Sequence, residues 1–118
     1  MDISNFYSRK GSKYHNKKVS VDGILFDSTK EAKRYKELSL LLRAGEIQDL
    51  RLQVEYILIP NQYIDGKLVE RATKYIADFV YTENDKEVVE DAKGVRTDVY
   101  KIKKKLMLSQ YGIRIKET

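Results

Sequence analysis

Two apolar runs on either side of a short turn constrain this chain more than any other feature. The runs are Ile76–Tyr81 and Val88–Gly94, and residues 84–86 between them read Asn-Asp-Lys. β-Branched and aromatic residues on both sides of an Asn/Asp turn predict a β-hairpin. Each run also contains a carboxylate, Asp78 in the first and Asp91 in the second.

Carboxylates are unusual in strands that are expected to be buried. Successive side chains of a strand alternate between its faces, so Asp91 and Lys93 should share one face while Glu90 and Ala92 share the other. If the two runs pair as a hairpin, Asp78 can lie near Asp91. Burial of a carboxylate among apolar side chains is unfavourable unless a cation, a hydrogen bond or protonation compensates. A carboxylate pair beside a lysine therefore suggests a metal site.

The first part of the chain predicts an arm, a hairpin and a helix. Residues 1–16 are polar and basic without a regular hydrophobic period, which is typical of a flexible arm. Asp22-Gly23 between two short apolar runs predicts a second hairpin. Ser28 followed three residues later by Glu31 matches a capping box, and a helix is expected from Thr29 to Ala44, before Gly45.

The rest of the chain predicts strands, a turn near Asp65-Gly66 and one more helix. In that helix Val99, Ile102 and Leu106 fall at helical spacing and should form its apolar stripe. These patterns predict an α/β fold in which residues 17–118 form a single domain. The expected elements are strands at Ile47–Leu52, Val54–Ile59, Thr73–Tyr81 and Glu87–Lys93, a helix at Thr97–Tyr111 and a last strand at Ile113–Ile115.

The distribution of charge favours an anionic partner. The net charge is +5. Residues 1–18 carry five Lys or Arg and one acidic residue, and residues 93–105 carry six Lys or Arg and one acidic residue. Residues 19–92 between them carry ten Lys or Arg and fifteen acidic residues. An acidic centre between basic flanks suits a metal-dependent enzyme that acts on a polyanion. Ordinary solvated surface charge is the alternative interpretation.

Composition excludes several classes of site. The chain of 118 residues has no cysteine, so disulfides and thiolate zinc sites are excluded. Its single histidine, His15, excludes chemistry that needs a histidine pair. No run approaches the roughly 20 apolar residues needed to span a bilayer, and the N-terminus lacks the layout of a signal peptide. We therefore expect a cytoplasmic protein.

The spacing of an Asp, about a dozen residues and then Asp-x-Lys resembles that of the PD-(D/E)xK nuclease superfamily. The chain is similar to a small phage-associated endonuclease group within it. The shared motifs are Asp-Ser-x-x-Glu-Ala at 27–32, Tyr-Ile-Ala-Asp-Phe at 75–79 and Glu-Asp-Ala-Lys-Gly at 90–94. This resemblance covers roughly residues 28–115. It implies a restriction-endonuclease-like core, a mixed sheet flanked by helices in the order αβββαβ.

The resemblance also implies roles for individual residues. Asp78 and Asp91 would be the acidic metal ligands, with Lys93 as the catalytic lysine. Glu31 and the main-chain carbonyl of Ala92 would complete the metal site, although a helix cap explains Glu31 equally well.

Two residues near this site depart from the family pattern, and a third, Gln53, has two interpretations. Ala77 stands where many relatives have proline, and Asp91 where glutamate is commoner. Gln53 is interpreted as an exposed strand residue, with contact to water or phosphate as the alternative.

The expected activity is Mg²⁺- or Mn²⁺-dependent hydrolysis of DNA phosphodiester bonds. Carboxylates are hard oxygen ligands of the kind that these ions prefer, and Lys93 would position the attacking water. Basic side chains of the arm and of the second helix should hold the DNA backbone. The candidate DNA-binding residues are Lys10, Lys13, Lys17, Lys18, Lys101, Lys103 and Lys104.

A chain of this size offers little surface for reading a long sequence. Structure-selective cutting of a branch or four-way (Holliday) junction is therefore expected, in phage recombination, replication or packaging in the host cytoplasm. Many superfamily members that cut duplex DNA act as dimers. A homodimer would therefore be compatible with this activity. The alternative is a noncatalytic DNA-binding module that retains the fold, and a more distant one is a protein that binds an acidic protein partner.

Overall fold

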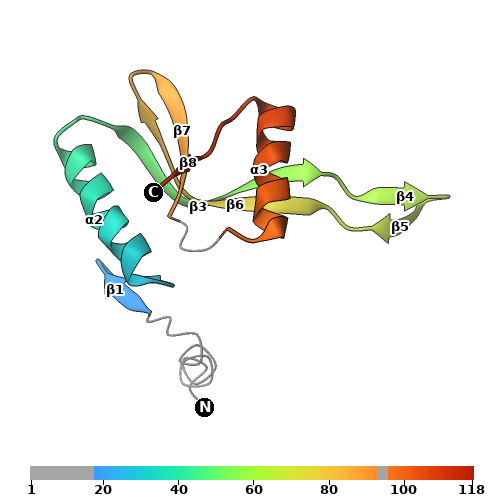
Figure 1. Ribbon diagram of the computed structural model, residues 1–118, viewed down its shortest axis with the longest axis horizontal. Coiled ribbons are helices and arrows are strands. Elements are labelled where there is room, and N and C mark those ends of the chain that lie inside the picture. The colour runs from blue at the N-terminus through green and yellow to red at the C-terminus, as the bar shows by residue number, and fades with distance from the viewer. Residues whose placement is uncertain (1–17, 93–95) are drawn as a thin grey trace, which may run out of the picture. The chain divides into compact units, whose positions relative to one another are not determined.

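The computed structural model describes residues 18–92 and 96–118, which form a mixed α/β structure with two helices (Figure 1). The chain divides into two compact units, residues 1–45 and 46–118. The first contains strands β1 (Val19–Val21) and β2 (Ile24–Phe26) and helix α2 (Thr29–Arg43). The second contains β3 (Gln48–Ile59), β4 (Gln62–Ile64), β5 (Lys67–Glu70), β6 (Thr73–Glu83), β7 (Lys86–Asp91), α3 (Asp98–Tyr111) and β8 (Lys116–Glu117).

The first unit follows its local sequence signals. β1 and β2 pair as an antiparallel hairpin, and the turn residues Asp22 and Gly23 have φ of 53° and 78°. Both residues lie in the left-handed region, which is what a two-residue hairpin turn requires. Helix α2 begins after its cap residue Ser28 and is followed by Gly45 at φ 78°, so the predicted hairpin and helix are confirmed.

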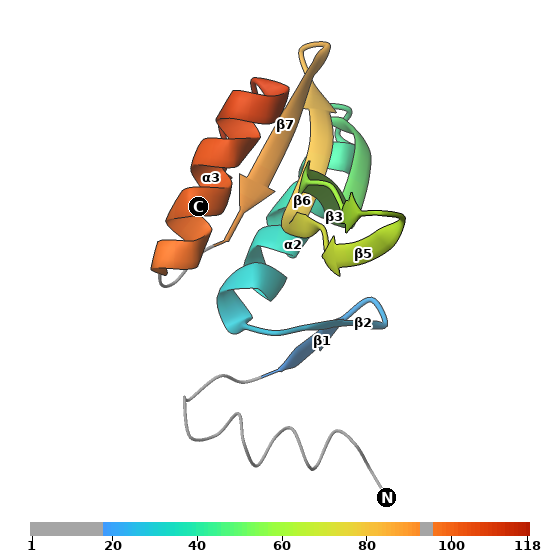
Figure 2. The same ribbon diagram turned by 90° about the vertical axis from the view of Figure 1, so that its right-hand side faces the viewer.

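The second unit is built on a four-stranded mixed sheet in the order β3-β6-β7-β8. β3, β6 and β7 pair antiparallel, whereas β8 runs parallel to β7 after the crossover through α3. Helix α3 lies along the sheet (Figure 2). Tyr100 and Met107 of the helix form one buried cluster with Ala77, Val80 and Val89 of the sheet.

Three details of the second unit differ from expectation. The two strands predicted on either side of Gln53 are one strand, β3, because pairing with β6 continues past it. The last strand is Lys116–Glu117, whereas Ile113 and Ile115 of the predicted strand contribute to the core without pairing in the sheet. An alternating pattern reports which side chains are buried, but it does not show that the backbone pairs.

The third difference concerns the buried face of α3. Val99 and Ile102, predicted to be buried, are 61% and 57% exposed, whereas Tyr100 and Met107 are buried. The helix has apolar residues on more than one face, so the spacing rule alone could not select the face that meets the sheet.

A hairpin that the sequence signalled only by its turn extends beyond the paired ends of β3 and β6 (Figure 1). Its strands β4 and β5 pair antiparallel, and the turn residues Asp65 and Gly66 have φ of 51° and 77°. Every residue from 61 to 70 is exposed, so this hairpin contributes surface rather than core. Among the described residues, no helix has the length and apolar character needed to cross a membrane.

Candidate active site

The predicted carboxylate pair lies at one end of the β6–β7 hairpin. Phe79 pairs with Glu90 in the register of these strands, and Asp78 and Asp91 are the next residues outward. The backbone N–H of Ala92 donates a 3.0 Å hydrogen bond to Oδ2 of Asp78. This bond ties the end of β7 to Asp78, so Asp78 and Asp91 are neighbours across the hairpin. Their binding of a shared metal ion stays a prediction.

The alternation of side chains along β6 breaks at Asp78. Ala77 and Val80 both belong to the cluster under α3, although a regular strand would place residues three apart on opposite faces. Gln53 occupies the facing position, because its neighbours Leu52 and Val54 pair with Phe79 and Ala77.

Gln53 itself has a φ of 52°, in the left-handed region that residues other than glycine rarely adopt. This irregularity lets the alternation of side chains between the two faces of the sheet shift beside the candidate site. Strain of this kind is often concentrated at functional positions.

Asp91 is completely buried and is held by a tyrosine. Its exposed fraction is 0%, and Oδ1 is shielded from solvent. Oδ2 accepts a 2.6 Å hydrogen bond from the hydroxyl of Tyr75. Burial, followed by this hydrogen bond, raises the pKa of Tyr75 far above its usual range, so the phenol stays protonated and keeps donating.

Glu90 points away from Asp91, as the strand period predicted. It is fully buried, and its Oε1 accepts a 2.7 Å hydrogen bond from the hydroxyl of Tyr81. Its Oε2 accepts a second bond from Oγ1 of Thr118 at 3.3 Å. These contacts support a structural role for Glu90.

Glu31 serves as a helix cap within the first unit. Its backbone N–H donates to Oγ of Ser28 at 3.1 Å, and its Oε1 accepts from the backbone N–H of Asp27 at 3.3 Å. The carboxylate therefore reaches one residue further back than in the usual capping box, which bonds the cap residue itself. The capping half of the prediction is confirmed, and the role as a metal ligand stays a prediction.

The candidate DNA-binding lysines fall into three groups. Lys10, Lys13 and Lys17 lie outside the described residues, as does the predicted catalytic residue Lys93. Lys18 pairs with Asp27 at 3.6 Å and Lys104 with Glu117 at 3.3 Å, so part of their charge is neutralised. Lys101 is exposed and Lys103 half-buried.

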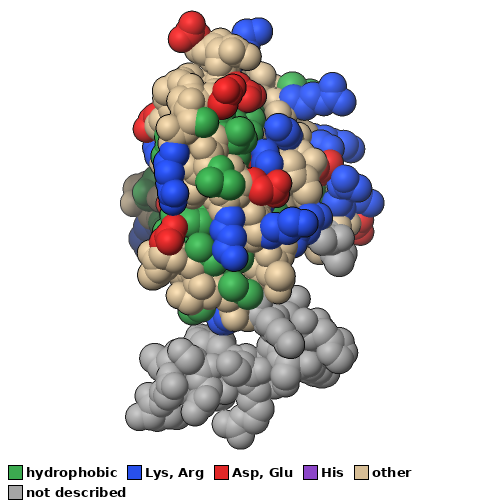
Figure 3. All heavy atoms as spheres, turned by 90° about the vertical axis from the view of Figure 1, so that its left-hand side faces the viewer, with side chains coloured by type: hydrophobic (Ala, Val, Ile, Leu, Met, Phe, Trp, Pro, Cys, Tyr) green, Lys and Arg blue, Asp and Glu red, His purple; other side chains and the backbone are tan. Residues whose placement is uncertain are grey.

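Positive charge is not gathered into one unbroken surface on the face drawn in Figure 3. That face carries many Lys and Arg side chains, with Asp and Glu side chains among them.

Sequence reasoning missed a charged cluster around Glu117, which lies beside Asp91 because β8 pairs with β7. Glu117 accepts a 2.7 Å hydrogen bond from the hydroxyl of Tyr100 and pairs with Arg96 at 3.0 Å and with Lys104 at 3.3 Å. The hydrogen bond from Tyr100, followed by that from Arg96, lowers the pKa of Glu117 to about 2. No local pattern in the sequence marks this cluster, since its members meet only through the crossover.

The carboxylate pair has the chemistry of a divalent-cation site but is small. Asp78 and Asp91 supply hard oxygen donors from adjacent strands, and the N–H of Ala92 binds Asp78. The role of the Ala92 carbonyl as a ligand stays a prediction. No group of three or more His, Cys, Asp or Glu side chains in residues 18–92 and 96–118 is arranged to hold a metal. A Mg²⁺ ion fits this donor set if water completes its coordination, as Mg²⁺ commonly requires.

Comparison with known proteins supports family membership alone. Neither a curated protein nor a solved structure matches the chain. One family model matches residues 11–117, which cover most of the chain and include Glu31, Asp78, Asp91 and Lys93. The chain therefore belongs to the family described as "Protein of unknown function (DUF1064)".

Proposed function

We propose that this protein is a Mg²⁺-dependent nuclease that hydrolyses DNA phosphodiester bonds on a restriction-endonuclease-like core. The observation that carries the proposal is the open end of the β6–β7 hairpin, where Asp78 and Asp91 are neighbours and the N–H of Ala92 donates to Asp78. A buried carboxylate that is oriented by a tyrosine and lies beside a strand with broken alternation is more typical of a functional site than of a sheet edge.

The order of elements supports the finer fold assignment. Apart from the two small hairpins, α2, β3, β6, β7, α3 and β8 follow one another as αβββαβ. The sheet order β3-β6-β7-β8, with β8 parallel to β7 after a helical crossover, is compatible with such a core.

Each residue of the site has a separate role in the proposed mechanism. Asp78 and Asp91, together with the Ala92 carbonyl, would hold the ion, and the hydroxyl of Tyr75 fixes the orientation of the Asp91 carboxylate through Oδ2. Bound Mg²⁺ supplies Lewis acidity and screens the charge on the phosphate. Lys93 follows Asp91 by two residues and orients the attacking water, while basic side chains hold the DNA backbone.

A cleavage assay tests the proposal. The protein is incubated with Mg²⁺ or Mn²⁺ and labelled four-way junction, flap, duplex or single-stranded DNA. We expect the junction or the flap to be cut, with cleavage abolished by EDTA and by Asp78→Asn, Asp91→Asn or Lys93→Ala. Asp85→Asn is the matched control, because Asp85 lies in the turn of the same hairpin at φ 63°, which asparagine tolerates. Absence of cleavage by the wild type, or full activity of all three variants, would show that the protein is not this enzyme.

A noncatalytic DNA-binding module is the second candidate. Two observations favour it: Asp91 is completely buried, and no three His, Cys, Asp or Glu side chains among the described residues are arranged to hold a metal ion. This alternative predicts DNA binding that survives chelation of metal and the Lys93→Ala substitution, without cleavage of any substrate.

A further inference from the structure

The base of the β4–β5 hairpin contains a hollow that the proposed catalytic site does not use. Its volume is about 780 Å³, within the roughly 300–1,000 Å³ range of small-molecule sites. Apolar side chains of Ile57, Pro60, Tyr63 and Leu68 line part of it. Tyr63 is 59% exposed, so the ring is available to a ligand. We call this space the hairpin hollow.

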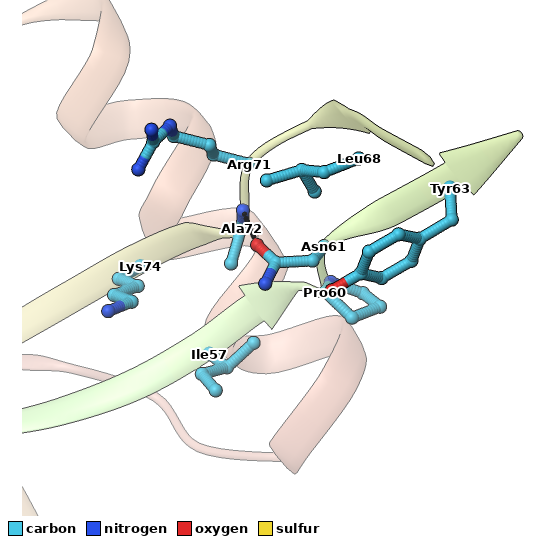
Figure 4. A pocket seen from close by; sticks show the side chains of 8 residues that line it. All are labelled: Ile57, Pro60, Asn61, Tyr63, Leu68, Arg71, Ala72 and Lys74. Carbon is cyan, nitrogen blue, oxygen red and sulfur yellow. Dashed lines mark hydrogen bonds between the residues drawn. The ribbon is translucent and has the colours of Figure 1, made fainter. Parts of the chain in front are cut away.

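Polar groups line the rest of the hairpin hollow. Asn61 accepts a 2.6 Å hydrogen bond from the backbone N–H of Ala72 through Oδ1, which orients its amide and leaves the amide nitrogen turned away from Ala72 (Figure 4). Arg71 and Lys74 also line the hollow. Figure 4 shows Tyr63 and Pro60 at one end of the hollow and Arg71 and Lys74 towards the other.

This arrangement matches the parts of a nucleotide. A flat ring and apolar side chains suit a base, an oriented amide donor suits a base edge or sugar oxygen, and two cations suit the phosphate. Lys74 forms an ion pair with Glu55 at 2.6 Å, but both side chains are about half exposed. Surface pairs of this kind contribute little to stability, so a phosphate can replace the glutamate.

Lys74 connects the hairpin hollow to the surroundings of the carboxylate pair. It also lines a second, smaller hollow of about 270 Å³ together with Tyr75, Thr97, Tyr100 and Lys103. Tyr75 is the residue that donates to Asp91. A DNA strand that follows both hollows would therefore meet Arg71, Lys74 and Lys103 before it reaches the proposed site of cleavage.

We infer that the hairpin hollow binds an unpaired nucleotide of DNA, with the base on Tyr63 and its phosphate at Arg71 and Lys74. This inference rests on the proposed function and adds a substrate class to it, branched or partly single-stranded DNA. A base within a duplex keeps its faces stacked on its neighbours, so only an unpaired base can offer a face to Tyr63.

Binding of a short oligonucleotide tests the inference separately from cleavage. Fluorescence anisotropy would follow a labelled single-stranded oligo(dT) of about twelve nucleotides in EDTA, so that no catalytic step contributes. We expect Tyr63→Ala to weaken binding roughly ten-fold and Tyr63→Phe to retain most of it, because stacking needs the ring and not the hydroxyl. Arg71→Ala should weaken binding and reduce the dependence of log affinity on log salt by roughly 0.7, the loss of one phosphate contact.

Two exposed residues that do not line the hairpin hollow provide matched controls. Ile64 adjoins Tyr63 on the same strand, is 63% exposed and does not line the hollow, so Ile64→Ala should bind as the wild type does. Lys86 is exposed at the start of β7 and lines neither hollow, so Lys86→Ala, which removes one positive charge, should also bind as the wild type does.

The outcomes separate this inference from the nuclease proposal. If Tyr63→Ala and Arg71→Ala bind oligo(dT) as tightly as the wild type, the inference is wrong even when the wild type cuts branched DNA. If the wild type has no affinity for oligo(dT), the hollow is not a nucleotide site and its apolar lining fits a protein partner instead. Binding that depends on Tyr63 in a protein that cuts no DNA would support the inference and contradict the nuclease.

Discussion

The hydroxyl of Tyr75 donates a 2.6 Å hydrogen bond to Oδ2 of Asp91, and both side chains are buried. Tyr75→Phe should therefore leave a buried carboxylate oxygen without this donor, which destabilises the fold by about 1–3 kcal/mol. Cleavage should fall about ten-fold or more, because residues that orient a metal ligand typically have effects of that size. Chemical denaturation and a single-turnover cleavage assay measure the two effects.

Tyr63→Phe is the control for this change, since it removes a hydroxyl from an exposed tyrosine of the same unit. We expect it to leave the stability unchanged. Wild-type stability and cleavage in Tyr75→Phe would mean that the hydrogen bond does not position Asp91.

Substitutions at the start of α2 separate the two roles of Glu31. Ser28→Ala removes the acceptor for the Glu31 N–H and should cost about 1 kcal/mol of stability. Glu31→Gln should retain the fold, because glutamine can accept the same bond from Asp27. Thermal unfolding checks both expectations.

Cleavage by Glu31→Gln then shows whether the Glu31 carboxylate binds the metal or serves only as a helix cap. Loss of cleavage in a variant of unchanged stability would assign the carboxylate to the metal, since an amide is a poorer ligand for Mg²⁺. Retained cleavage would leave Glu31 as a cap alone.

Glu117 should make stability depend on pH in the acid range. Its pKa is about 2 in the folded protein and 4.5 in its ordinary state, so the unfolded chain binds the proton more readily. The stabilising contribution is therefore complete above about pH 4.5 and is lost as the pH falls from there towards 2.

A variant isolates this contribution. Glu117→Gln should unfold at a lower temperature than the wild type at pH 7, and the difference should shrink towards pH 2. Melting curves at pH 7, 4 and 2.5 give the comparison, and a difference that stays constant across them would contradict the assignment. Lys116→Gln, on the exposed neighbour in the same strand, controls for a change at this end of the chain.

Gln53 should respond to substitution in the opposite sense to an ordinary strand residue. Its φ of 52° is accessible to glycine at little cost and is unfavourable for a β-branched residue. Gln53→Gly should keep or raise the melting temperature, whereas Gln53→Val should lower stability by about 1–3 kcal/mol.

Glu55, two residues along the same strand, is outside the left-handed region and provides the reference. There glycine should destabilise and valine should be tolerated. The same ranking at both positions would show that the backbone at Gln53 carries no strain.

Local signals in the sequence were sufficient wherever a structure depends on neighbouring residues. Asp22-Gly23 and Asn84-Asp85 need only their own φ preferences, and Ser28 caps its helix through a contact three residues away. The neighbourhood of Asp78 and Asp91 follows for the same reason, because a short turn sets the register of the two strands that it joins.

Tertiary structure decided the features that join distant segments. Gln53 faces Asp78 only because β3 pairs with β6. Tyr75 reaches Asp91 only because the alternation of side chains along β6 breaks at Asp78. Glu117 meets Tyr100 through a parallel crossover, and the buried face of α3 was selected by the sheet. The sequence by itself thus determined the turns, the capped helix and the placement of Asp78 and Asp91 next to one another on neighbouring strands. The environment of those carboxylates depended on contacts between strands and a helix far apart in the chain, which no local preference encodes.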